Sequence, residues 1–322
     1  MKRLSPGKIP IDVLSSTVLR LTGAPSDNVA TPPRAGLDFA AIKSDGRFMI
    51  ISADPVTGVV EKIGKYAMNV SANDVATSGN RPQFAESVVL LPEGANAGDV
   101  KKVAIEIHAE AKRLGINIVG GHTEVTRGLH RPIVAVTAFS FVDDYVSSKD
   151  AKKDDSIMLT KTAGIEGTAV LGGGKFLDSI SVVDEAVAAY RTGYVHAMHD
   201  CTEGGVLGAV FEMSLASGLG FELNERLVPV APETRAMCRR LSIDPLRLIG
   251  SGALLLSVER GRESELQRTL APICKVTAVG KFAKKGVRVL AHKGGRRQTV
   301  RYAPEDELWR VLGHKSRRSK RL

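Results

Sequence analysis

Cysteine and tryptophan are scarce in this sequence of 322 residues. It contains three cysteines, Cys201, Cys238 and Cys274, and one tryptophan. The cysteines lie far apart and form no CxxC pair, so the sequence offers neither a zinc cage nor a disulfide framework. Sparse, unpaired cysteines are typical of a reducing compartment, and we therefore expect a cytoplasmic protein.

Long hydrophobic runs are also absent. The longest, residues 133–142, spans ten residues and includes Thr137 and Ser140. A membrane-spanning helix requires about 20 apolar residues. Pro6, Gly7 and Lys8 stand where a signal peptide has its apolar run. We expect a soluble protein that makes no membrane contact.

Acidic residues are scarce at one end of the chain only. Residues 281–322 contain 14 Lys and Arg but three acids, whereas residues 1–280 contain 31 basic and 32 acidic residues. The formal net charge of +10 therefore comes from a basic C-terminal segment and not from the body of the protein. Such a segment is either a solvated extension or a contact for an acidic partner or RNA.

Strands and helices are expected to alternate along the chain, which predicts a mixed α/β fold. Apolar runs bounded by turn residues indicate strands at 48–54, 83–91, 117–119, 132–142, 156–160, 195–199, 253–258 and 276–279. Apolar residues at helical spacing indicate helices at 56–68, 97–114, 165–171, 182–192 and 203–216. A polar, glycine-containing loop is expected after residue 119.

The charged stretch 143–155 has few apolar residues and marks a domain boundary. We expect an N-terminal domain over residues 1–147, a C-terminal domain over 148–303 and a basic tail over 304–322.

The tail contains four apolar residues at helical spacing, Leu308, Trp309, Val311 and Leu312. They predict one docking helix within the tail. The part expected to be dispensable for folding and nucleotide binding therefore begins after Gly313.

Carboxylates and glycines gather in four clusters where expected strands give way to helices. These are residues 36–40 with 52–55, then 71–79, 120–124 and 199–205. Mg²⁺ prefers carboxylate and phosphate oxygens, and glycine turns present N–H groups to phosphates. Taken singly, each cluster is better explained as a helix cap or a tight turn.

Asp38, Asp54 and Asp74 each lie beside an apolar strand or helix. They are expected to converge and to supply magnesium with oxygen ligands. The common nucleotide signatures, the Walker A loop and the Rossmann GxGxxG motif, are absent from the sequence.

In their order and spacing, the clusters resemble the superfamily of aminoimidazole ribonucleotide (AIR) synthase, HypE-type hydrogenase maturation proteins, thiamine-monophosphate kinase and selenophosphate synthetase. The likeness is greatest to archaeal HypE-like, AIR-synthase-related proteins and covers roughly residues 7–290. The segments that carry it are 52–58, 73–76, 120–124, 160–167, 199–205, 244–245, 250–253 and 279–280.

The resemblance implies an N-terminal α/β domain that pairs with its twin to form a dimeric β-barrel, and a C-terminal α/β domain packed alongside. A homodimer is therefore expected. The resemblance also implies a cleft that binds ATP, with the phosphates and Mg²⁺ held by the acidic clusters.

Residue by residue, the resemblance implies ATP contacts from Asp38, Asp54, Asn73, Asp74, Gly120, Gly121 and Thr123. It implies metal contacts from Asp38, Asp54, Asp74 and Glu124. His199, Asp200 and His122 are the candidate catalytic residues.

Two positions depart from the superfamily pattern. Leu37 stands where an aspartate is frequent, and His122 stands where an acid often follows Gly-Gly. Glu124, two residues on and so on the same side of an extended segment, is expected to substitute for that acid. His122 is interpreted as a general base or as a hydrogen-bonding loop residue.

Members of the superfamily use ATP to phosphorylate a substrate or to activate an amide-type oxygen. We expect a Mg-ATP-dependent enzyme that acts in one of these ways on a small-molecule or partner-borne substrate. A kinase resembling thiamine-monophosphate kinase and a non-catalytic nucleotide-binding scaffold with a basic docking tail are the alternatives. HypE-type proteins carry a C-terminal cysteine, whereas this sequence has Leu322 there. No covalent substrate adduct is therefore expected on this chain.

Overall fold

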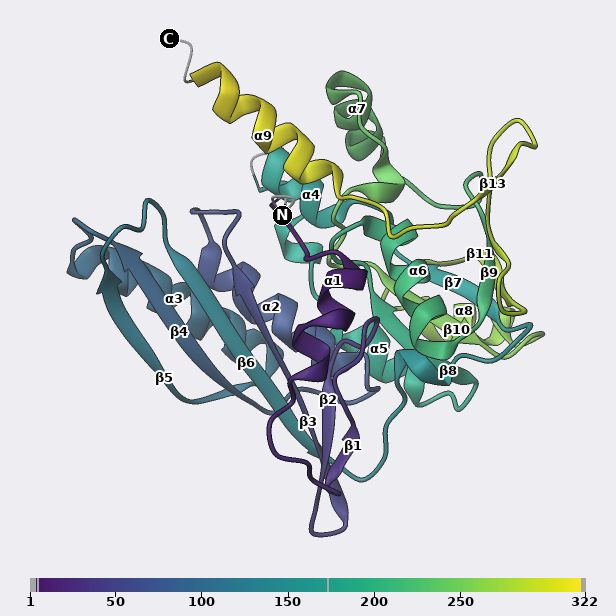
Figure 1. Cartoon of the computed structure of the whole chain (residues 1–322), viewed down its shortest axis with the longest axis horizontal. Coiled ribbons are helices and arrows are strands. Elements are labelled where there is room, and N and C mark those ends of the chain that lie inside the picture. Colours follow the sequence, from purple (N-terminus) through teal and green to yellow (C-terminus); the bar gives the residue numbers. More distant parts are fainter. Residues whose placement is uncertain (1–3, 5, 173, 320–322) are drawn as a thin grey trace.

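The computed structural model describes residue 4, residues 6–172 and residues 174–319, with side chains up to residue 313. Its described strands form two sheets, one from each half of the chain, and helices pack on both (Figure 1). The expected mixed α/β fold is confirmed. Among the described residues, no helix combines the length and the apolar character that a membrane crossing requires.

The first sheet has the strand order β1-β2-β3-β6-β4-β5. Its strands are β1 (Val29–Thr31), β2 (Ala40–Ser44), β3 (Arg47–Val56), β4 (Phe84–Pro92), β5 (Asn117–Thr126) and β6 (Ile133–Val142). Neighbouring strands are antiparallel except β4 and β5, which are parallel. Along β6 every second residue is fully buried, which is the alternation of a strand with one face on the core.

Two helices, α2 (Ile63–Ala76) and α3 (Ala97–Leu114), form the layer beside this sheet (Figure 1). Helix α3 has the expected bounds. Asn96 caps its N-terminus by accepting a 2.7 Å hydrogen bond from Gly98 N, and Gly115 ends it in a left-handed conformation with φ 76°. The N-terminal segment adds α1 (Ile11–Ser16) and a 3₁₀ turn, Val18–Arg20.

The second sheet has the order β13-β12-β9-β11-β7-β10-β8 and is antiparallel except for the pair β9 and β12. Its strands are β7 (Ser156–Thr160), β8 (Val195–Asp200), β9 (Gly220–Asn224), β10 (Leu254–Val258), β11 (Val276–Ala283), β12 (Arg288–Ala291) and β13 (Arg297–Thr299). The helices of this half are α4 (Ile165–Leu171), α5 (Val183–Tyr190), α6 (Gly205–Ser217), α7 (Pro232–Leu241), α8 (Glu263–Leu270) and α9 (Glu307–Ser319). Three 3₁₀ turns complete it, Ser148–Asp150, Leu177–Ser179 and Pro245–Arg247.

One apolar core joins the two halves. It contains Ile63 and Val103 from the helices of the first half together with Val183 and Met198 from the second. A buried side-chain amide adds hydrogen bonds between the two halves. Asn73 donates a 2.8 Å hydrogen bond to Ile180 O and accepts one of 2.8 Å from Val182 N. The junction between the two halves is therefore closely packed.

Two expected elements were placed wrongly. Helix α2 begins at Ile63 and not at residue 56, because β3 stays paired with β6 as far as Val56. Asn73 and Asp74 consequently lie in the last turn of a helix and not at a helix start. The expected loop after residue 119 is part of β5, which pairs with β4 along its whole length.

The C-terminal segment expected as a basic tail is partly packed. Leu308 of α9 is buried in a cluster with Met237, Cys238 and Leu248, and Val311 and Leu312 pack against that cluster. Trp309 Nε1 donates a 2.7 Å hydrogen bond to Glu203. Among the described side chains, α9 thus packs through Leu308, Val311 and Leu312, as expected for a docking helix.

Leu308→Ala is expected to lower the free energy of unfolding by about 2–4 kcal/mol, because it removes a buried side chain and leaves a cavity. Deleting residues 314–322 is expected to change it by no more than about 0.5 kcal/mol, because this basic segment contains one apolar residue, Leu322. Urea unfolding of both variants measures this. A truncation as damaging as the Leu308 substitution would show that the terminal basic segment is structural.

Candidate functional site

A group of acidic side chains meets at the junction of the two halves. Its members are Asp38 before β2, Asp54 on β3, Asp74 at the end of α2, Asp200 at the end of β8, Glu203 in the turn before α6, and Glu212 on α6. We call this group the acidic cluster. One carboxylate oxygen each of Asp38 and Asp200 and a ring nitrogen of His199 all lie within 4.8 Å of one another.

Asp74 and Asp54 form the part of the acidic cluster contributed by the first half. Ser52 Oγ donates a 2.7 Å hydrogen bond to Asp74 Oδ2. Burial raises the pKa of Asp74 well above its usual value, and the charges of Asp54, Asp200 and Asp38 raise it further. Burial also raises the pKa of Asp54. A hydrogen bond with Asp74 and the charge of Lys8 act in the opposite direction and lower the pKa of Asp54. The two carboxyl groups thus compete for a proton, which a cation can replace.

His199 is buried between two carboxylates. Its Nδ1 contacts Asp38 Oδ1, and its Nε2 lies 3.0 Å from Glu212 Oε2. Burial alone lowers the pKa of His199, but Asp38 and Glu212 outweigh it and raise the pKa to about 10. The ring is therefore a cation at neutral pH. Both ring nitrogens contact carboxylate oxygens, which favours a role for His199 as a positive charge that orients Asp38 and Glu212.

The acidic cluster has oxygen atoms that the protein leaves unused. Asp38 Oδ2 and Asp200 Oδ2 are buried, and neither has a hydrogen-bond partner among the described residues. Unpartnered buried carboxylate oxygens are costly unless a cation engages them. With Asp54 and Asp74 beside them, these residues form an all-oxygen donor set of the kind that Mg²⁺ prefers.

Lys8 reaches this site from the N-terminal segment, and sequence reasoning missed it. Its Nζ donates hydrogen bonds to Glu212 Oε1 at 3.2 Å and to Thr202 Oγ1 at 3.2 Å. Its backbone N donates one of 2.7 Å to Glu203 Oε2. Lys8 and Glu212 are 204 residues apart, so no local motif could indicate their contact.

The third predicted cluster lies elsewhere in the chain. Gly120, Gly121, His122, Thr123 and Glu124 are exposed on β5, the edge strand of the first sheet. Gly121 is level with Asp54 across β4 and β6, three strand spacings away, which is about 14 Å. His122 Nε2 instead pairs with Glu124 Oε2 at 3.0 Å. Within one chain, the structure does not bring these five residues to the aspartates.

Gly121 is nevertheless needed where it stands. It has φ 149°, and a Cβ there would lie 2.1 Å from Ser87 O of β4. Glycine thus permits the close pairing of β5 with β4. The ATP and metal roles expected for this cluster stay predictions, as does the ATP role of Asn73, whose amide is engaged with Ile180 and Val182.

The three thiols are poor nucleophiles. Cys201 and Cys238 are buried and Cys274 is half-buried. Burial raises the pKa of all three, to about 11 for Cys238 and Cys274. A thiolate is the reactive form, so none of them is activated near neutral pH.

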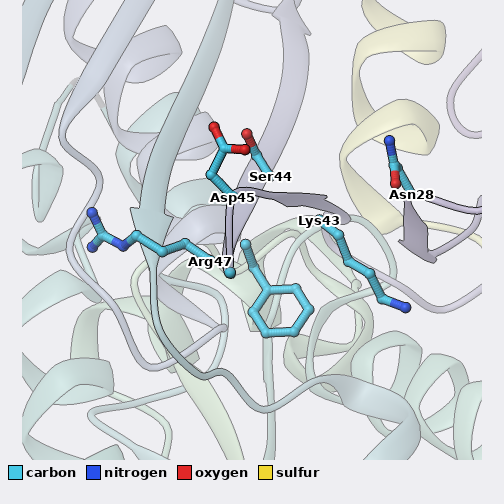
Figure 2. A pocket seen from close by; sticks show the side chains of 7 residues that line it. Asn28, Lys43, Ser44, Asp45 and Arg47 are labelled. Atoms are coloured by element: carbon cyan, nitrogen blue, oxygen red, sulfur yellow. The ribbon is translucent and has the colours of Figure 1, made fainter.

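A cavity of about 430 Å³ lies elsewhere, at the hairpin between β2 and β3 (Figure 2). Lys43, Asp45 and Arg47 line it. Arg47 and Asp54 are seven residues apart along β3, roughly 23 Å. This cavity is therefore separate from the acidic cluster.

Comparison with known proteins agrees with this architecture. Residues 36–142 match the N-terminal domain model of the AIR synthase related proteins, and residues 152–293 match the C-terminal domain model. Together the two models cover most of the chain. The chain belongs to the AIR synthase related family.

Relatives of this AIR synthase related protein include two proteins of named role. Carbamoyl dehydratase HypE of Escherichia coli is 28% identical over 285 residues, which cover 82% of this chain and 85% of HypE. A candidate hydrogenase expression/formation protein of Methanocaldococcus jannaschii is 25% identical over 305 residues, 89% of this chain and 90% of that protein.

Solved structures share the fold. HypE in the HypE–HypF complex superposes with a TM-score of 0.78 at 22% identity, covering 90% of this chain and 99% of that one. HypE in complex with ATP superposes with a TM-score of 0.72 at 20% identity, covering 95% of this chain and 98% of that one. The protein AaThiL, complexed with AMPPCP and TMP, gives 0.70 at 18% identity, with 92% and 95% covered.

Glu166 is a further buried acid near the acidic cluster. It lies in the first turn of α4 and is 8% exposed, and its Oε2 has no hydrogen-bond partner among the described residues. Burial raises the pKa of Glu166 to about 7, and the charges of Asp306 and Glu203 act in the same direction.

This shift predicts how stability depends on pH. The folded-state pKa of Glu166, about 7, is above the ordinary 4.5, so between these values the folded protein binds more protons than the unfolded chain. The free energy of unfolding should therefore fall as pH rises through this window, with a share from Glu166 of up to roughly 3 kcal/mol. Glu166→Gln should remove that share. Urea unfolding from pH 5 to pH 8 tests this, and equal pH slopes for both proteins would contradict it.

Proposed function

We propose that this protein binds Mg-ATP at the acidic cluster and uses it to activate or phosphorylate an oxygen atom of a second substrate. One observation carries the proposal. Asp38, Asp54, Asp74 and Asp200 converge from separate elements, and two of their buried oxygens have no partner within the described chain. Such a concentration of buried negative charge is unfavourable for a protein that binds no cation.

Solved structures of related proteins support the binding of a nucleotide. A HypE of the same fold has been solved with ATP, and AaThiL with AMPPCP. Both are less than 25% identical to this chain, so they show the fold, and nucleotide binding by this chain is our inference. The E. coli relative is named a carbamoyl dehydratase, which favours activation of an amide-type oxygen here.

The four aspartates of the acidic cluster and the neighbouring His199 have distinct roles in this proposal. Asp38 and Asp200 would hold Mg²⁺ through their unpartnered oxygens, with Asp54 and Asp74 beside them, and the metal would offset negative charge on the phosphates. His199 orients Asp38 and Glu212 through its two ring nitrogens. It is thus a positioning residue, while Asp200 has the side chain free to face a ligand.

The substrate is expected to arrive as a free small molecule or on a partner protein, because no thiol of this chain is activated. Incubation with ATP and a metabolite library, followed by mass spectrometry, separates the reaction classes. A phosphorylated product indicates a kinase, whereas loss of water or ring closure indicates oxygen activation.

Free cysteines also support a cytoplasmic location.

Asp74→Asn and Asp54→Asn are expected to weaken Mg-dependent ATP binding by about tenfold or more, because each removes a charge from the cation site. Asp74→Asn should unfold at a temperature no lower than that of the unsubstituted protein, since it also removes like-charge repulsion. Calorimetric titration with ATP and Mg²⁺ measures the affinity. Unchanged affinity in both variants would show that the nucleotide does not bind at this site.

We further propose a homodimer formed through the first sheet. Strand β5 is ten residues long, is exposed on both faces and forms the sheet edge. It exposes Ile118, Val119 and Val125. Long exposed apolar edge strands pair with another chain unless they are covered, and a second copy of β5 is the simplest cover. Binding of an acidic partner or RNA by the basic tail, residues 304–322, stays a prediction.

Val119→Lys is expected to convert the dimer to a monomer, because it places a charge in the proposed apolar interface. Val18→Lys is the control, since Val18 is also an exposed valine but lies in the N-terminal segment. Sedimentation equilibrium at micromolar concentration reports the mass. A monomeric unsubstituted protein, or a dimer that tolerates Val119→Lys, would contradict this interface.

A further inference from the structure

Lys8 is held at the acidic cluster by contacts of Glu203 with both the N-terminal segment and the C-terminal helix α9. Glu203 accepts a 2.7 Å hydrogen bond from Lys8 N through one oxygen and a 2.7 Å hydrogen bond from Trp309 Nε1 through the other. Between them, Gly7 has φ 107°, and a Cβ there would lie 2.8 Å from the Trp309 ring. Glycine is thus required for the N-terminal segment to pass Trp309 and deliver Lys8.

The ammonium group of Lys8 is the second cation of the site. Its Nζ contacts both oxygens of Glu212, at 3.2 and 3.3 Å, and Thr202 Oγ1. Glu212 also binds the buried His199. Among the described contacts of the acidic cluster, His199 and Lys8 are the two cationic side chains. The acidic side chains they face are the six members of the cluster, Asp38, Asp54, Asp74, Asp200, Glu203 and Glu212.

Lys8 differs from His199 in its exposure. Its side chain is 51% exposed, whereas that of His199 is 3% exposed. Its aliphatic chain is flexible, and its ammonium group can form three hydrogen bonds in varied directions. A half-exposed lysine at the rim of a proposed metal-nucleotide site can therefore exchange carboxylate oxygens for phosphate oxygens without disturbing the fold.

We propose that Lys8 is a phosphate ligand that also serves as the resident counter-ion of the acidic cluster until Mg-nucleotide binds. This inference rests on the proposed function. It assigns to one side chain two effects of opposite sign. Against Mg²⁺ alone, the positive charge of Lys8, which acts on Asp54 and Asp200, repels the ion and weakens metal binding. Towards Mg-nucleotide, it adds a charge-assisted hydrogen bond to the phosphates and strengthens binding.

The test is Lys8→Met, with Lys102→Met as the matched control. Lys102 has a similarly exposed side chain, 49%, and pairs with the exposed Glu61 at 2.8 Å, so its substitution removes a lysine and an ion pair away from the site. Calorimetric titrations would use Mg²⁺ alone and Mg-AMPPCP, on the full chain. Lys8→Met should bind Mg²⁺ more tightly, by a few-fold, and Mg-AMPPCP more weakly, by about tenfold. Lys102→Met should match the unsubstituted protein in both.

Lys8→Arg separates charge from shape, since it keeps the cation and should retain most of the Mg-AMPPCP affinity. Thermal melting checks that each variant is folded. If Lys8→Met shifts both affinities in the same direction, or neither, the inference is wrong. If the unsubstituted protein and Lys102→Met also fail to bind Mg-AMPPCP, the proposed function itself is wrong.

Discussion

Repulsion among carboxylates at the junction of the two halves is the constraint on which the rest of this structure depends. Burial and neighbouring negative charge raise the pKa of Asp74 and Asp200 well above the usual range. His199, fixed between Asp38 and Glu212, compensates part of this charge from within. Buried ionic groups contribute little net stability, which supports the proposal that the acidic cluster binds a cation.

The fold holds these charges together through close packing away from the acidic cluster. A single apolar core runs from α2 and α3 into α5, β8 and β10, and Asn73 bridges the same junction with two hydrogen bonds. Gly36 lets the segment before β2 press on α6, because a Cβ there would lie 2.2 Å from Glu212 O. Asp38, two residues on, thereby reaches His199. Rigid elements on both sides therefore fix the geometry of the site.

Local signals in the sequence predicted much of the fold and part of the site. Helix α3 has a capping residue, an amphipathic face and a terminal glycine, and its bounds were predicted correctly. Strand β6 was predicted from its apolar run. Asp38, Asp54 and Asp74 were expected to converge because each lies near the end of a regular element, and the structure brings their charges together.

The missed features depend on contacts that no local pattern encodes. Strand β5 is exposed on both faces, so it has none of the alternation that reveals a half-buried strand. Lys8 and Glu212 meet across nearly two thirds of the chain, and Glu166 is recognisable only by its burial beside Glu203 and Asp306. The C-terminal helix was foreseen from four apolar residues, but its bond from Trp309 to Glu203 was not.

The most direct measurement is an anomalous difference map from crystals grown with Mn²⁺ and AMPPCP. Manganese replaces Mg²⁺ at oxygen-rich sites and is located by its anomalous signal. We predict a peak in coordination contact with Asp38 and Asp200, with Asp54 and Asp74 around it and the nucleotide phosphates on its open side. A nucleotide bound at the hairpin cavity of Lys43 and Arg47, or a cluster that stays free of metal with nucleotide bound elsewhere, would contradict it.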